Sequence, residues 1–226
     1  DYTVSVGPVA EMIHQAKDLV AKGFTTLKLK VGSQSEQTDV ETVAAIRQAV
    51  GPKIHLRLDA NQGWHHKQAI SAINKMAEMG LQIQLVEQPV PAADFDGMAA
   101  VTQNTSTLIM ADESIFSVQD AQRLINMKGC DIINLKLMKS GGIDNALKIN
   151  TFAETAGIAC MVGSMIESSV SVTAAASLAA AKRNVQYVDL DASLMFSANP
   201  LAGGLINQKD QLQLPDRPGM GFEGSI

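Results

Sequence analysis

The chain has 226 residues, of which 46% are hydrophobic and 4% aromatic, and its formal net charge is -5. This length fits one large α/β domain, and the many aliphatic residues can fill a sizeable core. A mildly acidic chain without basic runs argues against nucleic acid or an anionic membrane as a partner, and no apolar stretch is long enough for a membrane span. Cys130 and Cys160 are the only cysteines. Their isolated positions indicate reduced core residues in a cytoplasmic protein.

Short β-rich runs alternate with longer helical patterns along the chain. We expect strands at residues 3–7, 25–31, 54–59, 82–87, 108–111, 131–137, 158–162 and 185–190. Helical patterns lie between them at residues 10–22, 67–79, 95–103, 118–127, 143–156 and 169–181, and a further one is marked by Val40, Val43, Ala44 and Ile46 and closes near Gly51-Pro52. Gly23, Gly80, Gly129 and Gly157 follow the ends of helical patterns, which is a common place for glycine.

This alternation predicts parallel strands that are joined by right-handed crossovers. Eight strands favour a closed (β/α)8-type barrel, which residues 1–198 would form. The alternative is an open doubly wound sheet, but the Gly-x-Gly-x-x-Gly that usually follows its first strand is missing. Residues 199–226 form a tail rich in proline and glycine, without an obvious amphipathic helix.

Charged residues stand at the ends of the predicted strands, where barrel enzymes carry their chemistry. In chain order they are Lys28, Lys30, Asp59, Glu87, Asp112, Lys136, Asp189 and Asp191. Each has an ordinary explanation on its own, because an Asp often caps the next helix and a strand Lys often faces solvent. Lys136, however, has apolar neighbours on both sides, where a lysine is costly unless it is used. The joint pattern therefore indicates an active site.

Ring geometry predicts how these side chains meet. In a closed ring of eight, the second and sixth strands lie opposite each other, so Lys30 and Lys136 are expected to face each other across the mouth. The third, fourth and fifth strands lie together, so Asp59, Glu87 and Asp112 are expected to converge. Three carboxylates with room for water and substrate suit Mg²⁺.

Such a site would move a proton next to a substrate carboxylate. The metal would stabilise the negative charge that forms when one lysine removes the α-proton, and the opposite lysine would return a proton to the other face. The neighbouring charge of Lys28, a nearby cation and burial are expected to lower the pKa of Lys30 and make it a base. Asp189 and Asp191 share one strand face and are expected to bind a cation such as a substrate ammonium group.

These residues resemble the motifs of the enolase superfamily, in its muconate-lactonizing subgroup, whose sites combine a lysine base with Mg²⁺. The matching motifs are Lys28-Leu29-Lys30, Asp59-Ala60-Asn61, Glu87-Gln88-Pro89, Asp112-Glu113-Ser114 and Lys136. The Asp189-Leu190-Asp191 segment resembles the last-strand motif of the dipeptide epimerases in this subgroup, and residues 161–168 resemble their strand-seven loop. The resemblance extends from the first strand to the last.

The resemblance implies a modified (β/α)7β barrel and a cytoplasmic, Mg²⁺-dependent isomerase that epimerises dipeptides of the L-Ala-D/L-Glu type, as in the metabolism of peptidoglycan peptides. The implied metal ligands are Asp59, Glu87 and Asp112, the acid/base residues Lys30 and Lys136, and the substrate-binding residues Lys28, Asp189, Asp191, Ser164 and Ile166. The partner would be a small-molecule dipeptide, and a homo-oligomer is compatible with the sequence.

Relatives of this kind also carry an N-terminal capping domain that closes the active site. This chain begins almost at the first strand, so we expect it to be the barrel part of a longer enzyme, with residues 199–226 packing against the missing domain. We also expect the barrel alone to have little activity, because its mouth is open to water.

Other enzymes of the subgroup share the metal and the lysines, namely o-succinylbenzoate synthases, N-acylamino-acid racemases and muconate cycloisomerases. They do not need an anionic pair on the last strand to hold an ammonium group, so Asp189 and Asp191 favour a dipeptide epimerase. The third alternative is a non-catalytic barrel that binds a ligand or a metal. Such a barrel would not need a lysine on each side of the site.

Overall fold

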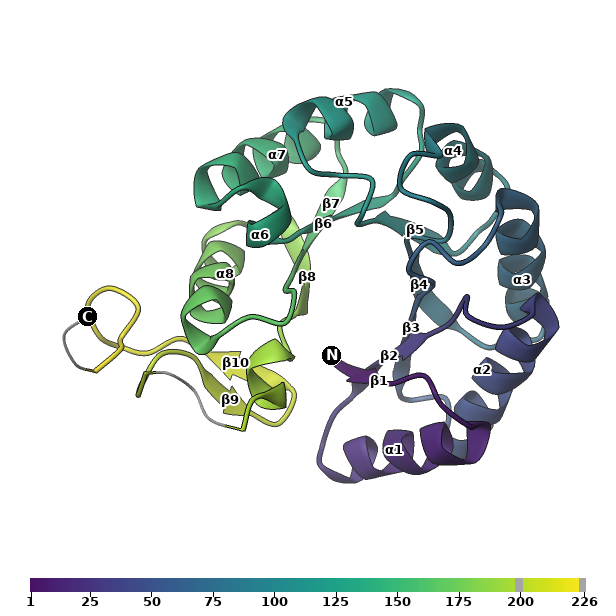
Figure 1. Cartoon of the computed structure of the whole chain (residues 1–226), viewed down its shortest axis with the longest axis horizontal. Helices are drawn as coiled ribbons and strands as arrows, with labels where there is room; N and C mark the ends of the chain where they lie inside the picture. Colours follow the sequence, from purple (N-terminus) through teal and green to yellow (C-terminus); the bar gives the residue numbers. More distant parts are fainter. Residues whose placement is uncertain (198–200, 224–226) are drawn as a thin grey trace.

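The computed structural model of the chain describes residues 1–197 and 201–223. Parallel strands form a ring, and helices surround it on the outside (Figure 1). The strands follow one another around the ring in chain order: β1 (Tyr2–Val4), β2 (Thr26–Lys30), β3 (His55–Asp59), β4 (Ile83–Glu87), β5 (Leu108–Ala111), β6 (Ile132–Leu135), β7 (Ala159–Gly163) and β8 (Val185–Asp189). This arrangement confirms the predicted α/β barrel architecture.

The helices cover the outer face of the strands. They are α1 (Val9–Ala21), α2 (Glu36–Val50), α3 (His66–Glu78), α4 (Phe95–Gln103), α5 (Val118–Asn126), α6 (Leu137–Ser140), α7 (Ile143–Thr155) and α8 (Ser169–Ala181). Local signals start several of them. For example, the Ser35 hydroxyl caps α2 by accepting a hydrogen bond from the Thr38 N–H at 3.2 Å. No helix of residues 1–197 and 201–223 is both long and apolar enough to cross a membrane.

The sixth strand is shorter than its sequence pattern predicts. We expected a strand over residues 131–137, but β6 ends at Leu135 and the one-turn helix α6 begins at Leu137. Lys136 is the N-cap residue of α6, and Gly141 ends the helix in the left-handed conformation with φ of 75°. Leu135 and Leu137 continue the apolar alternation of the strand, so the sequence pattern predicts a longer strand. This pattern does not reveal where the backbone turns.

The parallel ladder runs from β1 to β8, but within the described residues no ladder pair joins β8 back to β1. Side-chain contacts join these two segments instead. Asp191, just after β8, accepts a hydrogen bond from the Thr3 N–H of β1 at 2.9 Å through its Oδ2. The first strand, expected at residues 3–7, spans only Tyr2–Val4, so β1 offers few groups for a ladder.

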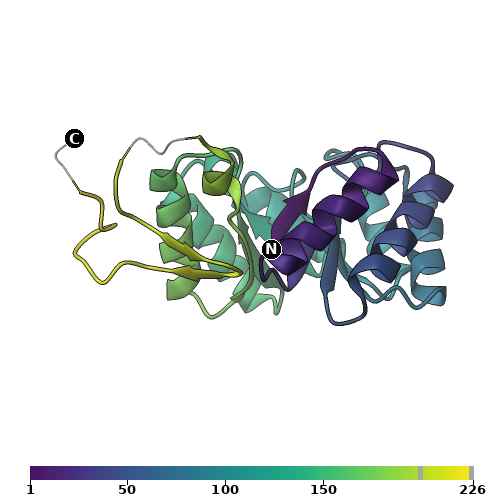
Figure 2. The ribbon, with the colours of Figure 1, turned by 90° about the horizontal axis from the view of Figure 1, so that it is seen from below.

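The described part of the tail contains a hairpin that the sequence pattern did not reveal. After the short 3₁₀ helix η1 (Ala192–Met195), β9 (Ile206–Gln208) pairs antiparallel with β10 (Gln211–Gln213). The hairpin lies beside the ring (Figure 2). The Leu205 N–H donates to the hydroxyl of Thr173 on α8 at 2.9 Å, and the Thr25 hydroxyl donates to Asp210 at 2.8 Å. Packing of residues 199–226 on a capping domain stays a prediction, and positions 199, 200 and 224–226 lie outside the described residues.

The interior of the ring is divided into an apolar floor and a polar layer. Leu85, Met110, Ile132 and Met161 form the floor, and each is at most 1% exposed. Because strand side chains alternate between the two faces, the residues two positions further along each strand also point inward, at the carboxyl end of the strand. Glu87 and Asp112 follow Leu85 and Met110 in this way, and Asn134 follows Ile132, so a polar layer lies next to the floor.

Two glycines allow the loops after β2 and β3 to touch. A Cβ atom on Gly63 would lie 2.8 Å from the Cα atom of Gly32, and a Cβ atom on Gly32 would lie 2.6 Å from the carbonyl oxygen of Ala60. The carboxylate of Asp39 on α2 fixes this contact by accepting hydrogen bonds from the Gly32 N–H and the Trp64 indole N–H, both at 3.0 Å. The contact therefore fixes the positions of the segments that follow Lys30 and Asp59.

We expect Gly63→Ala to destabilise the chain by about 1–3 kcal/mol, because its Cβ would overlap backbone atoms that cannot move independently. The measurement is the free energy of unfolding from a urea titration. Gly7→Ala is the matched control, since the nearest atom to its Cβ lies 3.7 Å away. Equal stability of the two variants would show that the two loops are free to separate.

Candidate active site

Three carboxylates gather at the carboxyl ends of three neighbouring strands. Asp59 and Glu87 are the last residues of β3 and β4 and are paired in register, and Asp112 follows the end of β5. All three side chains are at most 1% exposed. Parallel strands in register bring their ends to the same level, which is why residues far apart in the sequence meet here.

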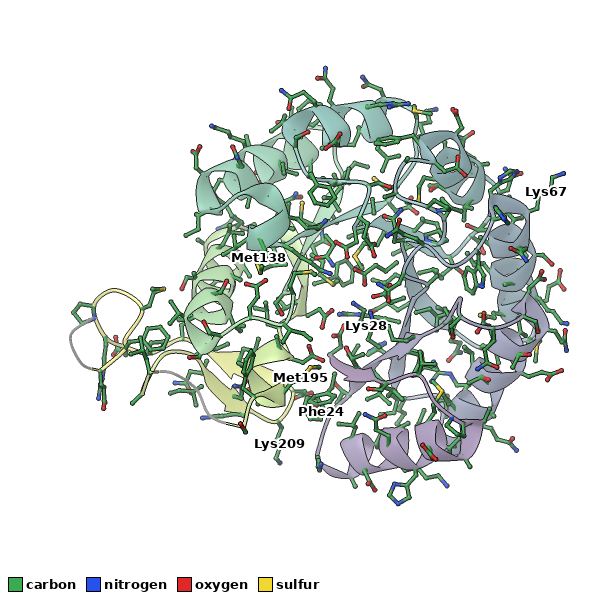
Figure 3. The ribbon with its side chains drawn as sticks, in the orientation of Figure 1. Phe24, Lys28, Lys67, Met138, Met195 and Lys209 are labelled. Atoms are coloured by element: carbon green, nitrogen blue, oxygen red, sulfur yellow. The ribbon has the colours of Figure 1, made fainter. Side chains whose placement is uncertain are left out.

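Lysine ammonium groups lie between these carboxylates. The Nζ atom of Lys28 lies 2.7 Å from Glu87 Oε2, 3.0 Å from Asp59 Oδ2 and 2.7 Å from Asp189 Oδ2. Lys28 is only 4% exposed, and Figure 3 shows it inside the ring of strands. One lysine thus links acids on the β3–β4 side with the acid at the end of β8.

Lys30 and Lys136 extend from opposite sides of the ring, since β2 and β6 lie across from each other (Figure 1). Lys30 donates hydrogen bonds to Asp59 Oδ2 and Asn61 Oδ1, both at 2.7 Å. Lys136 donates to Asp112 Oδ2 at 2.6 Å. Both lysines line the same cavity, whose volume is ≈ 560 Å³.

The electrostatics of the cluster follow from burial and from these ion pairs. Burial, together with the charges of Asp59 and Asp112, raises the pKa of Glu87 to about 8. Asp112 behaves in the opposite way: burial alone would raise its pKa, but Lys139 and Lys136 lower it to about 2. Burial opposes the charge on Lys28, yet Asp189, Glu87 and Asp59 raise the pKa of this lysine well above its usual range.

The donor set fits a hard divalent cation. Asp59, Glu87 and Asp112 provide carboxylate oxygens, which Mg²⁺ prefers, and burial, followed by the charges of Asp59 and Asp112, raises the pKa of Glu87. Among residues 1–197 and 201–223, no three acidic, imidazole or thiol side chains stand ready as a ligand set. Lys28 lies against Asp59 Oδ2 and Glu87 Oε2, and Lys136 lies against Asp112 Oδ2.

Asp189 and Asp191 approach the same cavity from β8 but make different contacts. The Oδ2 atom of Asp189 is paired with Lys28, while its Oδ1 atom is buried and without a hydrogen-bond partner. Burial and then Asp189 raise the pKa of Asp191, whose Oδ2 atom accepts from Thr3. Unsatisfied buried acceptors of this kind favour a cationic ligand group.

The loop after β7 completes one wall of the cavity. Ser164 and Ile166 both line it, and Ile166 is 76% exposed. The Glu167 carboxylate fixes this loop by accepting a hydrogen bond from the Met165 N–H at 2.8 Å. The remaining walls contain apolar side chains, namely Phe116, Met138, Met165 and Met195. Figure 3 shows Met138 and Met195 among them, whereas Lys67 lies outside the ring of helices.

All the predicted site residues are thereby located. Eight line the cavity directly: Lys28, Lys30, Asp112, Lys136, Ser164, Ile166, Asp189 and Asp191. Asp59 and Glu87 do not line it but contact Lys28, which does. Their roles stay predictions.

Sequence reasoning missed three supporting residues. Gln88 is fully buried, and its side-chain oxygen accepts from the N–H groups of Asp112 and Ser114 at 3.0 and 3.1 Å. Asn134 donates to Glu87, and Lys139 is paired with Asp112. The signal was spacing: Asn134 lies on β6 two residues before Lys136, and Lys139 lies three residues after Lys136, in the one-turn helix α6.

The raised pKa of Glu87 predicts a pH dependence of stability in metal-free protein. Its pKa is about 8 in the folded chain against 4.5 for an ordinary Glu, so its contribution to stability is complete below pH 4.5 and is lost as the pH rises through 8. We expect Glu87→Gln to flatten the pH dependence of unfolding between these values, measured by urea titration with a chelator present. The exposed Glu78→Gln is the control. Parallel curves for wild type and Glu87→Gln would contradict the raised pKa.

Comparison with known proteins agrees with this geometry. Residues 11–225 match the family model described as "Enolase C-terminal domain-like". The chain is 48% identical over 224 residues to an L-Ala-D/L-Glu epimerase of Clostridium acetobutylicum, and this match covers 99% of the chain and 62% of that protein.

Solved structures give the same result. A substrate-liganded complex of the L-Ala-D/L-Glu epimerase from Bacillus subtilis has a TM-score of 0.97 and 48% identity, covering 99% of this chain and 62% of that one. A dipeptide epimerase from Enterococcus faecalis complexed with Mg and the dipeptide L-Leu-L-Tyr has a TM-score of 0.94 and 46% identity, covering 99% and 63%. The chain thus spans less than two thirds of the length of these relatives. On its sequence, its barrel and its carboxylate–lysine cluster, it belongs to the enolase C-terminal domain-like family.

Proposed function

We propose that the protein to which this chain belongs is a Mg²⁺-dependent dipeptide epimerase, with L-Ala-D/L-Glu as the substrate type. The observation that carries the proposal is the cavity itself. It has a lysine from each of two opposite sides of the ring, the buried Asp112 carboxylate, and the carboxylates of Asp189 and Asp191 at the end of β8, while Asp59 and Glu87 lie behind Lys28. The relatives described as epimerases and the complex with Mg and a dipeptide support the same reaction.

Asp59, Glu87 and Asp112 would hold the Mg²⁺ ion, because they provide three buried carboxylates from adjacent strands. A bound ion supplies electrostatic stabilisation for negative charge on the substrate carboxylate. Lys28 lies beside Asp59 and Glu87 and would contribute a second positive charge there. Removing this charge would leave Glu87 without its ion-pair partner.

The two flanking lysines carry the proton steps. Lys30 in its neutral form would take the α-proton, and the electron pair of the broken C–H bond would spread onto the substrate carboxylate. Lys136, protonated and on the opposite wall, would donate its proton to the other face of the same carbon. The result is inversion at that carbon, with one proton gained by Lys30 and one lost by Lys136.

Asp189 and Asp191 would bind the ammonium group of the dipeptide. The unpartnered Oδ1 of Asp189 supports this role, because an ammonium group would supply the missing donor. Ser164 and the backbone near Ile166 would hold the peptide group from the neighbouring loop. The other enzymes of the subgroup stay alternatives for the chemistry, but this acidic pair favours a substrate with a free amino group.

The capping domain, the cellular location and the metabolic role of the enzyme are proposed on separate grounds. The capping domain would come from the part of the longer protein that this chain does not span. A cytoplasmic location rests on Cys130 and Cys160, which are both free and buried. A role in the metabolism of peptidoglycan peptides rests only on the L-Ala-D/L-Glu substrate type.

The two-lysine mechanism is tested on the complete protein. With Mg²⁺, we expect it to exchange the α-hydrogen of L-Ala-L-Glu with deuterium from solvent, measured by NMR, and to epimerise the dipeptide. Lys30→Ala and Lys136→Ala should each abolish epimerisation, while each retains exchange from at most one stereoisomer. Lys148→Ala, an exposed lysine on α7, is the control. Normal epimerisation by either site variant would defeat the assignment of two bases, and no exchange across a dipeptide library would defeat the epimerase proposal.

The role of the acidic pair is tested by Asp191→Asn. The amide oxygen can still accept from Thr3, so the fold should persist while the negative charge is lost. We expect about 1.5–3 kcal/mol weaker binding of the dipeptide, as for other hydrogen bonds to charged groups, with little change in Mg²⁺ binding, both by calorimetry. Asp144→Asn, on an exposed surface, is the control. If Mg²⁺ binding weakened more than dipeptide binding, Asp191 would be a metal or structural residue.

A further inference from the structure

Each carboxylate of the proposed metal site has one oxygen held by the protein scaffold. Asp59 Oδ1 accepts from the backbone N–H of Asn61 at 3.0 Å. Glu87 Oε1 accepts from the side-chain amide of Asn134 at 2.7 Å. Asp112 Oδ1 forms an ion pair with Lys139 Nζ at 2.7 Å. Three different donors thus perform the same task on three strands.

The second oxygen of each carboxylate faces the lysines of the cavity instead. These contacts join Asp59 Oδ2 and Glu87 Oε2 to Lys28, and Asp112 Oδ2 to Lys136. The oxygens that meet the ammonium groups of the cavity lysines are those that a cation would meet. Only one oxygen of each carboxylate therefore points toward the cation position.

The Asn134 amide is locked in this position. Its side chain is 1% exposed, and the neighbouring β7 has Gly163 beside it. A Cβ atom on Gly163 would lie 2.7 Å from Asn134 Oδ1 and 3.0 Å from Nδ2, so only glycine leaves room for this amide. Gly163 has an ordinary backbone conformation, since it is not among the glycines with positive φ. Its function here is therefore to provide space.

Lys139 is held just as firmly. Its Nζ atom forms the ion pair with Asp112 Oδ1 and donates hydrogen bonds to the carbonyl oxygens of Asp112, Ile115 (3.0 Å) and Asn134 (3.3 Å). Its side chain is 7% exposed. An ammonium group with this many fixed acceptors cannot swing toward a substrate, which distinguishes Lys139 from Lys136.

We propose that Asn134 and Lys139 are positioning residues that restrict Glu87 and Asp112 to binding a cation through one oxygen each, and so select Mg²⁺ over Ca²⁺. Mg²⁺ requires compact octahedral coordination, whereas Ca²⁺ accepts more oxygens and readily takes both oxygens of one carboxylate. When Asn134 and Lys139 hold one oxygen of each carboxylate, that carboxylate cannot bind a cation through both oxygens. Ca²⁺ therefore loses a mode of coordination that Mg²⁺ does not need. This inference rests on the metal site of the proposed function.

The test measures the Kd values of Mg²⁺ and Ca²⁺ by calorimetry on the complete protein, without substrate. In Asn134→Leu and Lys139→Met we expect Mg²⁺ binding to weaken by about tenfold or more, and Ca²⁺ binding to weaken less. The ratio of the two Kd values should move toward Ca²⁺. Using the ratio cancels the loss of the Lys139 charge, which affects two divalent ions alike. Lys148→Met makes the same chemical change on the surface and should leave the ratio unchanged.

Gly163→Ala tests the same proposal without substituting Asn134 or Lys139. Its Cβ would push the Asn134 amide away from Glu87, so the Kd ratio should shift as in Asn134→Leu. Circular dichroism without metal checks that each variant is folded. An unchanged Kd ratio in the folded variants would overturn the proposal.

Crystal structures of the wild-type complete protein with Mg²⁺ and with Ca²⁺ need no variant. We expect Glu87 and Asp112 to contribute one oxygen each to either ion, with Asn134 and Lys139 still bound to the other oxygen. Two oxygens from either carboxylate would overturn the proposal. If the wild type bound neither ion, the failure would lie in the proposed metal site and would remove this inference with it.

Discussion

The structure depends on how the barrel balances the charge that it buries. Asp59, Glu87 and Asp112 are almost inaccessible to water, and an uncompensated buried carboxylate costs several kcal/mol. Lys28 and Lys136 offset this cost at distances of 2.6 to 3.0 Å. The balance is incomplete, because the pKa of Glu87 rises to about 8 through burial and the nearby acids. In the metal-free chain Glu87 is therefore largely protonated at neutral pH, and its proton must leave before all three carboxylates can bind a divalent cation.

The barrel provides the rigidity that such a cluster requires. The apolar floor of Leu85, Met110, Ile132 and Met161 packs next to the charged layer inside the ring. Above the layer, the cavity walls contain methionine and phenylalanine side chains. Charges between two apolar layers interact more strongly than they would in water. The same arrangement that makes the acids costly to bury therefore makes their interactions effective.

Glycine has a specific role wherever two parts of the site approach closely. Gly32 and Gly63 bring together the loops that follow β2 and β3, and Gly163 leaves room for the Asn134 amide. The Asn61 N–H, the Asn134 amide and the Lys139 ammonium group hold the outer oxygens of the carboxylates. The site thus has a fixed outer frame, with Lys28 and Lys136 on the opposite oxygens.

The fold and most of the site could be predicted from the sequence, because period-two alternation and the β/α repeat are local properties of the chain. The same alternation put Lys30, Asp59, Glu87 and Asp189 at strand ends, where a ring must bring them together. Tertiary structure alone decided the rest. The strand after Asp131 turned into α6 at Lys136, the described tail formed a hairpin, and Asn134 and Lys139 found their carboxylate partners. The partners of Asn134 and Lys139 depend on which strands and loops lie side by side in the ring. No local pattern in the chain encodes the distance between a donor and a carboxylate oxygen on another strand.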